Sequence, residues 1–136
     1  NLEDACRIIH ERGACIAGVT DGANGSYFVW PDGTFYRCEP FTQATVVDTT
    51  GAGDSFHGAF LGNLVHTISH MKGQDTTSTT KHDRASIHAV ELLKACTHSD
   101  LEKAAIFASA VASLNTQGIG GRSSLPTLKS VQELIG

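Results

Sequence analysis

The sequence predicts an α/β fold in which a parallel sheet is flanked by helices. The first observation is an amphipathic stretch over residues 1–12 that ends before Gly13, a residue type common just after helix C-termini. Its predicted buried face consists of Leu2, Ala5, Cys6 and Ile9. The second is the apolar run Ala14–Thr20, which has the length of a strand buried on both faces of a parallel sheet. A helix joined to such a strand by a short link is typical of α/β proteins.

A hairpin is predicted after this strand. Ser26–Trp30 and Thr34–Glu39 are rich in aromatic and β-branched residues, and Pro31-Asp32-Gly33 separates them, which predicts a three-residue loop. Val46 and Val47 are predicted to end a further short strand. The hairpin is expected at one side of the parallel sheet.

Helical periodicity dominates the second half of the chain. Residues 54–68 are predicted to form a helix with Phe56, Ala59, Phe60 and Leu64 on one face, extended by Leu61, Val65 and Ile68. Residues 71–84 are polar and rich in Thr and Ser, so they are predicted to be an exposed, mobile loop. A weaker pattern predicts a helix over Ala85–Cys96.

Two more helices are predicted near the C-terminus. Ser99 and Glu102 have the spacing of a capping box, and the helix that they open extends to about Leu114. One stripe of this helix consists of Leu101, Ala105, Ala108 and Ala112, and its small residues predict tight packing. Pro126-Thr127 begins the last helix, whose predicted inward residues are Leu128, Val131, Leu134 and Ile135.

Composition excludes several classes of function. The 136 residues carry 10 Lys and Arg against 14 Asp and Glu, a net charge of −4, which argues against broad binding to nucleic acid or an anionic membrane. No apolar run is long enough to span a bilayer. The chain begins with Asn1 and shows no signal peptide, so it is either processed or a piece of something longer.

The cysteines indicate a reducing compartment. Cys6, Cys15, Cys38 and Cys96 form no Cys-x-x-Cys pair, so a structural zinc site is not expected. A disulfide framework in a secreted protein is the alternative, but the apolar content and the absence of a signal peptide favour free, mostly buried thiols. The sequence therefore predicts a cytoplasmic protein.

The segment Asp48–Asp54 is the best candidate for chemistry. A strand is predicted to end there, a Gly-Ala-Gly turn follows, and a helix begins, so backbone N–H groups and the helix dipole can hold an anion such as phosphate. A carboxylate at Asp54 would repel a bound phosphate. Its presence is explained if it accepts the proton of an attacking hydroxyl. That combination predicts phosphoryl transfer to an alcohol. The alternative is that Asp54 only caps the helix.

Other nucleotide and hydrolase motifs are not present. The chain has no Gly-x-x-x-x-Gly-Lys-[Ser/Thr] loop, and the Gly51–Phe56 segment does not contain the third glycine of the dinucleotide fingerprint. Ser55 does not stand in a Gly-x-Ser-x-Gly elbow, which argues against an α/β-hydrolase.

Three segments carry a resemblance to a known family. Asp48–Ala59 resembles the C-terminal signature of ribokinase-like (PfkB) carbohydrate kinases, and Thr20–Gly25 resembles that family's Thr-x-Gly-x-x-Gly segment. Phe107–Ala112, followed by Gly118–Pro126, is similar to its closing nucleotide-side helix and loop. The resemblance implies that residues 1–136 are the C-terminal, nucleotide-binding and catalytic part of a ribokinase-like domain, with an insertion at about 70–97.

The resemblance also implies roles for individual residues. Asp54 would be the catalytic base, and the N–H groups of Gly51, Ala52 and Gly53 would form an anion hole. Residues along the ATP phosphates and ribose would be Thr20, Gly22 and Gly25, with Ala108 and Val111 near the adenine. A monovalent cation such as K⁺ would take oxygens from Asp48, Thr50, Asn115, Gly118, Gly120 and Ser124. Mg²⁺ would accompany ATP, held mainly by phosphates and water.

The function implied is ATP-dependent phosphorylation of a sugar hydroxyl. The family's N-terminal half, which supplies most sugar contacts, has no counterpart in these 136 residues. Two alternatives stay open: a nucleoside kinase of the same superfamily, or a non-catalytic nucleotide-binding or dimerisation module. The expected partners are a small-molecule sugar and ATP, with neither nucleic acid nor membrane, and a homodimer of the full-length protein is left open.

Overall fold

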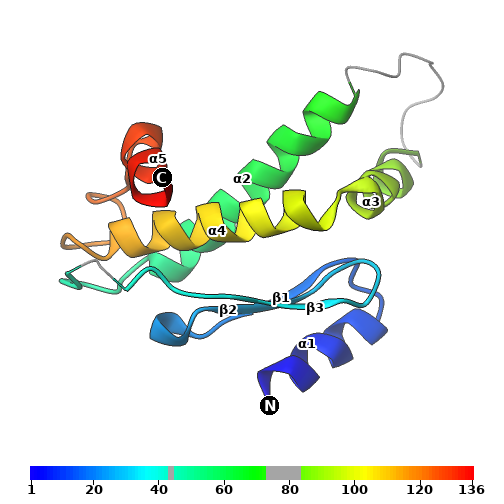
Figure 1. Cartoon of the computed structure of the whole chain (residues 1–136), viewed down its shortest axis with the longest axis horizontal. Coiled ribbons are helices and arrows are strands. Elements are labelled where there is room, and N and C mark those ends of the chain that lie inside the picture. The colour runs from blue at the N-terminus through cyan, green and yellow to red at the C-terminus, as the bar shows by residue number, and fades with distance from the viewer. Residues whose placement is uncertain (43–44, 73–83) are drawn as a thin grey trace.

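The computed structural model describes residues 1–42, 45–72 and 84–136 (Figure 1). In chain order its elements are α1 (Leu2–Glu11), β1 (Ala17–Thr20), the 3₁₀ turn η1 (Gly22–Asn24), β2 (Ser26–Val29), β3 (Phe35–Cys38), α2 (Ala52–Lys72), α3 (Arg84–Ala95), α4 (His98–Asn115) and α5 (Leu128–Ile135). In these ranges no helix is long and apolar enough to cross a membrane.

The described elements form layers around a small sheet. Helix α1 covers one face of the sheet, whereas α2 and α4 lie together over the other face (Figure 1). Helix α5 packs on α4, on the side that faces away from the sheet. Both flanking layers are therefore helical, as the sequence predicts.

The described sheet is antiparallel, so the predicted parallel arrangement is wrong for these strands. The order is β1-β2-β3, with Ala17 opposite Val29 and Ser26 opposite Cys38. Short turns join consecutive strands, and a parallel pair would need a crossover of about a dozen residues. The predicted hairpin is confirmed, because the Trp30 N–H donates to the Thr34 carbonyl across the three-residue loop.

Two strand predictions also need correction. Strand β1 begins at Ala17, and only Ala17 of its four residues is buried, so the strand is not covered on both faces. Val46 and Val47 lie outside any strand and are exposed. The backbone of this segment instead follows the end of α4, where the Thr116 carbonyl accepts from the Val47 and Asp48 N–H groups.

The helices lie close to where the sequence predicts them, but their buried faces agree less well with the prediction. Phe56, Phe60 and Leu64 are buried, but several other residues that the sequence predicts to face inward are largely exposed. The exposed ones are Ile9 of α1, Leu61 and Val65 of α2, and Leu128 and Ile135 of α5.

The ends of the helices give two further results. Helix α4 is capped by Thr97 with Asp100 rather than by Ser99 with Glu102, since the Thr97 hydroxyl and the Asp100 carboxylate each accept the other residue's N–H. The predicted helix over residues 85–96 is confirmed as α3. Most of the predicted loop, residues 73–83, lies outside the described residues.

The main core lies between the sheet and the pair α2 and α4. Phe28 of β2 stacks on Trp30 at 4.8 Å and on Phe60 of α2 at 5.1 Å between ring centroids. Leu101 of α4 is fully buried in the same cluster. All four cysteines are free thiols, as predicted, and burial raises the pKa values of Cys6, Cys38 and Cys96.

Replacement of Leu101 by Ala tests this core. The side chain is fully buried, so Leu101→Ala is expected to lower the free energy of unfolding by about 2–5 kcal/mol. Leu128→Ala, at a position that is 61% exposed, is the control and should change it by about 0.5 kcal/mol or less. Urea unfolding of the two variants makes the comparison, and equal effects would contradict the described packing.

Candidate nucleotide site

A cavity of about 560 Å³ brings several predicted site residues together. It lies between the β1–η1 turn, the segment before α2, the first turn of α2 and one face of α4. Five predicted residues line it: Thr20, Gly22, Gly25, Ala52 and Gly53. The volume falls within the range of small-molecule sites.

The turn into α2 has the geometry of an anion-binding helix start. Gly51 has φ +79°, and a Cβ atom there would lie 2.5 Å from the Gly121 Cα, so only glycine fits. The Ala52 N–H donates to the Thr49 carbonyl at 3.2 Å and is therefore already used. The N–H groups of Gly51, Gly53 and Asp54 have no acceptor within the described ranges, so they are the donors that a bound anion would meet.

Asp54 is exposed in the first turn of α2 and does not line the cavity. Among the described residues its carboxylate accepts no hydrogen bond from a helix N–H and pairs with no cation, so the capping interpretation has no support there. An exposed carboxylate one residue beyond Gly53, which does line the cavity, can receive a proton from a hydroxyl that approaches from solvent.

The predicted cation ligands lie in two segments that hydrogen bonds join. The Asp48 carboxylate accepts the Thr50 N–H and the Gly120 N–H, both at 2.9 Å. These donors, Gly120 first, lower the pKa of the Asp48 carboxyl below its ordinary value of 3.8. Gly118 lies against Ser124, because a Cβ atom there would collide with the Ser124 hydroxyl.

Asn115 is the least expected member of this group. It is fully buried at the end of α4, and both atoms of its side-chain amide are without a hydrogen-bond partner among the described residues. A buried amide without partners is costly and calls for a ligand or water. Oxygen donors of the kind that these residues offer are those that hard cations take.

A pH titration tests the Asp48 contacts. Because the folded pKa is lowered, the carboxylate stabilises the fold fully above about pH 4, and this contribution is lost as the pH falls through the folded value. Asp48→Asn is therefore expected to lower the Tm at neutral pH. The difference in Tm between the variant and the wild type should become smaller as the pH falls below 4. Circular dichroism measures both proteins, with Glu91→Gln on α3 as control. A Tm difference that is the same at every pH would contradict these contacts.

The two residues predicted near the adenine do not line this cavity. Ala108 is fully buried in the core, and Val111 packs against Val131 of α5, so neither lines the cavity. The residues of α4 that line it are Ser109, Ala112, Ser113 and Thr116. Their spacing of i, i+3, i+4 and i+7 is itself a sequence signal for one helix face, and it could have identified them.

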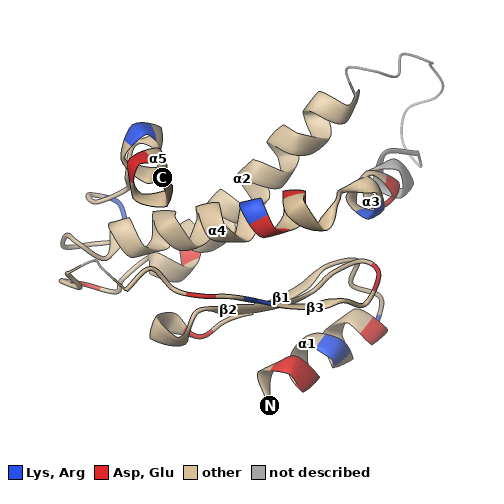
Figure 2. Ribbon diagram, viewed as in Figure 1, with Lys and Arg blue, Asp and Glu red and all other residues tan. Residues whose placement is uncertain are grey.

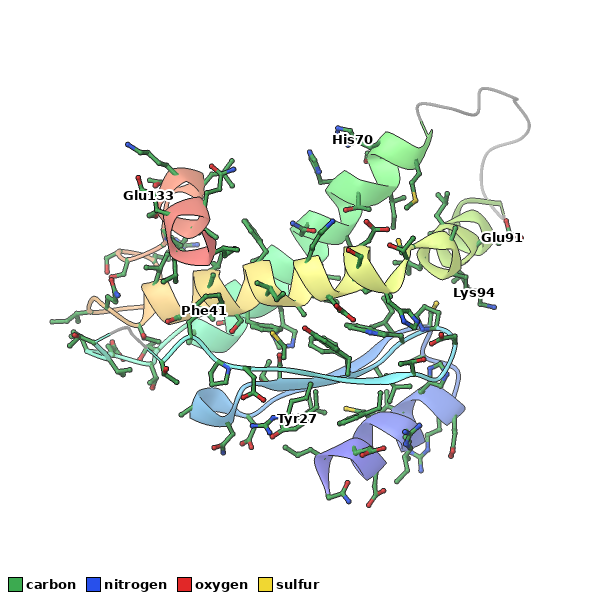
Figure 3. All side chains as sticks on the ribbon, viewed as in Figure 1. Tyr27, Phe41, His70, Glu91, Lys94 and Glu133 are labelled. Carbon is green, nitrogen blue, oxygen red and sulfur yellow. The ribbon has the colours of Figure 1, made fainter. Side chains whose placement is uncertain are left out.

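The segment before α2 supplies a cavity wall that the sequence did not indicate. Pro40 and Phe41 line the cavity, and Figure 3 shows Phe41 beside α4. The Ser113 hydroxyl donates to the Phe41 carbonyl at 3.1 Å, and the Ser109 hydroxyl donates to the Glu39 carbonyl at 3.4 Å. These contacts hold the wall against α4.

Comparison with known proteins settles the family. Residues 1–128 match the family described as pfkB family carbohydrate kinase. The chain belongs to this family. The solved relatives also confirm the ribokinase-like α/β fold, of which this chain covers one part.

Several relatives are kinases that are much longer than this chain. The bifunctional ribokinase/ribose-5-phosphate isomerase A of Fructilactobacillus sanfranciscensis is 29% identical over 129 residues, which are 95% of this chain and 18% of that protein. Ribokinase of Lactococcus lactis is 47% identical over 51 residues, 38% of this chain and 16% of that one.

The solved relatives are also much longer than this chain. Ribokinase of Thermotoga maritima is 25% identical with a TM-score of 0.65, over 99% of this chain and 34% of that one. Arabidopsis thaliana ribokinase, solved with ribose and ATP, is 28% identical with a TM-score of 0.65, over 98% and 33%. The chain thus spans about one third of these solved relatives and less of the curated ones.

Proposed function

We propose that this chain is the nucleotide-binding and catalytic part of an ATP-dependent carbohydrate kinase. The observation that carries the proposal is the cavity in which the first turn of α2 meets Thr20, Gly22 and Gly25. Membership of a carbohydrate kinase family supports it. The ATP phosphates lie against the α2 N-terminus and the β1–η1 turn, with the base toward the α4 face that carries Ser109 and Ala112.

The reaction follows from the helix start. The N–H groups of Gly51, Gly53 and Asp54 hold the transferred phosphoryl group. Ala52, whose N–H donates to the Thr49 carbonyl, contributes only to the shape of the turn. Asp54 accepts the proton of the sugar hydroxyl while that oxygen bonds to the γ-phosphorus and the bond to the ADP oxygen breaks. Mg²⁺ bound with ATP supplies charge neutralisation through phosphates and water.

A monovalent cation such as K⁺ belongs beside this turn in the same proposal. Its oxygens come from the side chains or carbonyls of Asp48, Thr50, Asn115, Gly118, Gly120 and Ser124. Support comes from the unpartnered buried amide of Asn115 and from the hydrogen bonds that join the Asp48 turn to Gly120. The cation would fix the backbone that presents the anion-binding N–H groups.

One alternative is favoured by a particular observation. Cytidine kinase of Thermococcus kodakarensis is 38% identical over 63 residues, 45% of this chain, which favours a nucleoside as acceptor. A nucleotide-binding module that does not turn over alone stays a second prediction. The insertion at about 70–97, a cytoplasmic location and a homodimer of the longer protein remain predictions.

Titration calorimetry of the 136-residue chain with ATP and Mg²⁺, followed by a sugar kinase assay on the same sample, tests the proposal. Binding of ATP without turnover is the expected result, because most of the sugar site is expected outside this chain. Absence of ATP binding would contradict the nucleotide site. Turnover by the chain alone would contradict the view that the sugar site is incomplete.

A further inference from the structure

Two histidines lie one helical turn apart on the exposed side of α2. His66 and His70 are both exposed, and the centroids of their rings are 4.2 Å apart. Residues at positions i and i+4 share one face of a helix, so the two imidazoles lie side by side. Figure 3 shows His70 near the end of α2, with its side chain pointing outward.

The His70 ring is oriented by its own helix. Its Nδ1 atom lies 2.8 Å from the His66 carbonyl oxygen. Because a carbonyl oxygen only accepts, this contact assigns the proton to Nδ1 and, in the neutral ring, the lone pair to Nε2. Histidines that bind metal ions commonly donate their other ring N–H to a carbonyl in this way, which fixes the tautomer and the direction of the ring.

Ion pairing does not account for the two histidines. Between Asp54 and Lys72 helix α2 contains no Lys, Arg, Asp or Glu, and Figure 2 shows it tan along most of its length. In the described part of the chain the histidine that pairs with a carboxylate is His98. Two protonated rings one turn apart would repel each other, whereas one metal ion can bind two neutral rings.

We propose that His66 and His70 bind one divalent ion of a late transition metal, such as Zn²⁺ or Ni²⁺. The ligands are Nε2 of His70 and a ring nitrogen of His66. Imidazole nitrogen suits these metals, whereas Mg²⁺ and Ca²⁺ take oxygen ligands. Within residues 1–42, 45–72 and 84–136 no group of three or more metal-binding side chains occurs, so water completes the proposed coordination.

The proposed ion would clamp one turn of α2. A bridge between positions 66 and 70 exists only while that turn is helical, so binding stabilises it. Thr67 stands where the His-Glu-x-x-His motif has its glutamate base, so no hydrolytic chemistry is assigned to the site. The proposal does not depend on ATP binding or on phosphoryl transfer.

Titration calorimetry of the 136-residue chain with ZnCl₂, without nucleotide, tests the site. His66→Gln and His70→Gln are each expected to weaken Zn²⁺ binding by at least about tenfold, because one imidazole then binds without its second ligand. Circular dichroism checks that both variants keep the helical content of the wild type. With MgCl₂ in place of ZnCl₂, the wild type and the variants should give the same heats.

His57→Gln is the matched control. Like His70, His57 is exposed on α2, and its Nδ1 atom lies 2.7 Å from the carbonyl oxygen four positions earlier, that of Gly53. One turn later, however, the chain has Leu61 in place of a second histidine. The Zn²⁺ affinity of His57→Gln should stay within about twofold of the wild type, because sites that share no partner act independently.

Rebuilding the pair one turn earlier gives a second measurement. A Cβ atom at Gly62 would meet no atom within 4 Å, so Gly62→His places a new ring one turn before His66. Added to His70→Gln, this change is expected to restore the Zn²⁺ affinity to within about threefold of the wild type.

Three results would overturn the proposal: no Zn²⁺ binding by the wild type, equal affinities for the wild type and both single variants, or no restoration by Gly62→His. Because no nucleotide is present, none of these results bears on the ATP site, and failure of the proposed function would be seen separately.

Discussion

Replacement of Asp54 by Asn in a full-length kinase that carries this chain is expected to lower the turnover number by about 10²–10⁴-fold. Asparagine has nearly the same shape, but its amide cannot take the proton of the sugar hydroxyl. The affinity for ATP should stay within about twofold, because the Asp54 side chain lies outside the cavity. A coupled assay measures turnover, and titration calorimetry measures ATP binding.

Asp32→Asn is the matched control for this experiment. Asp32 is an exposed carboxylate in the β2–β3 loop, paired with His98 and remote from the cavity. Its loss should leave turnover unchanged. Substantial turnover by Asp54→Asn would contradict the assignment of the base and would leave Asp54 a surface residue of the first helical turn.

Gly51→Ala is expected to weaken ATP binding by at least about tenfold and to destabilise the fold. The left-handed conformation alone costs an alanine about 1–2 kcal/mol, and the new methyl group would meet the Gly121 backbone at 2.5 Å. The Gly51 backbone cannot move without shifting the first turn of α2, which begins at the next residue. The N–H of Gly53 would then lie away from the position that a phosphate needs.

Gly58→Ala gives a control within the same helix. Gly58 has no neighbour within 4 Å of an added Cβ atom and lies in the interior of α2, so alanine should stabilise the helix by up to about 1 kcal/mol. Thermal unfolding and calorimetry of both variants complete the comparison. Wild-type ATP affinity in Gly51→Ala would show that the shape of the turn is not required.

Local patterns were sufficient to predict most elements of the fold. Helical spacing located α1, α2, α3 and α4, and Pro31–Gly33 located the hairpin loop, because each signal depends on residues close in sequence. Strand pairing depends on distant residues. The apolar run that contains β1 was therefore assigned to a parallel sheet, although in the described residues β1 pairs only with the antiparallel β2.

In the candidate site, too, the sequence predicts what depends on neighbouring residues better than what depends on contacts between distant ones. Gly51–Asp54 was predicted from one continuous motif, and the structure places this segment at a helix start beside Thr20, Gly22 and Gly25. On α4 the cavity is lined by Ser109 and Ala112, each one residue away from the predicted Ala108 and Val111. A helix rotates by about 100° per residue, so a shift of one position is enough to turn a side chain from the cavity into the core.

Amide-resolved NMR of the labelled chain, titrated with ADP and Mg²⁺, tests the central claim most directly. The claim predicts the largest shift changes at the N–H groups of Gly22, Gly25, Gly53 and Asp54, with smaller changes along the α4 face at Ser113 and Thr116. Changes confined to the β1 edge and to Leu61 and Val65 would contradict the claim, as would a spectrum that ADP leaves unaltered.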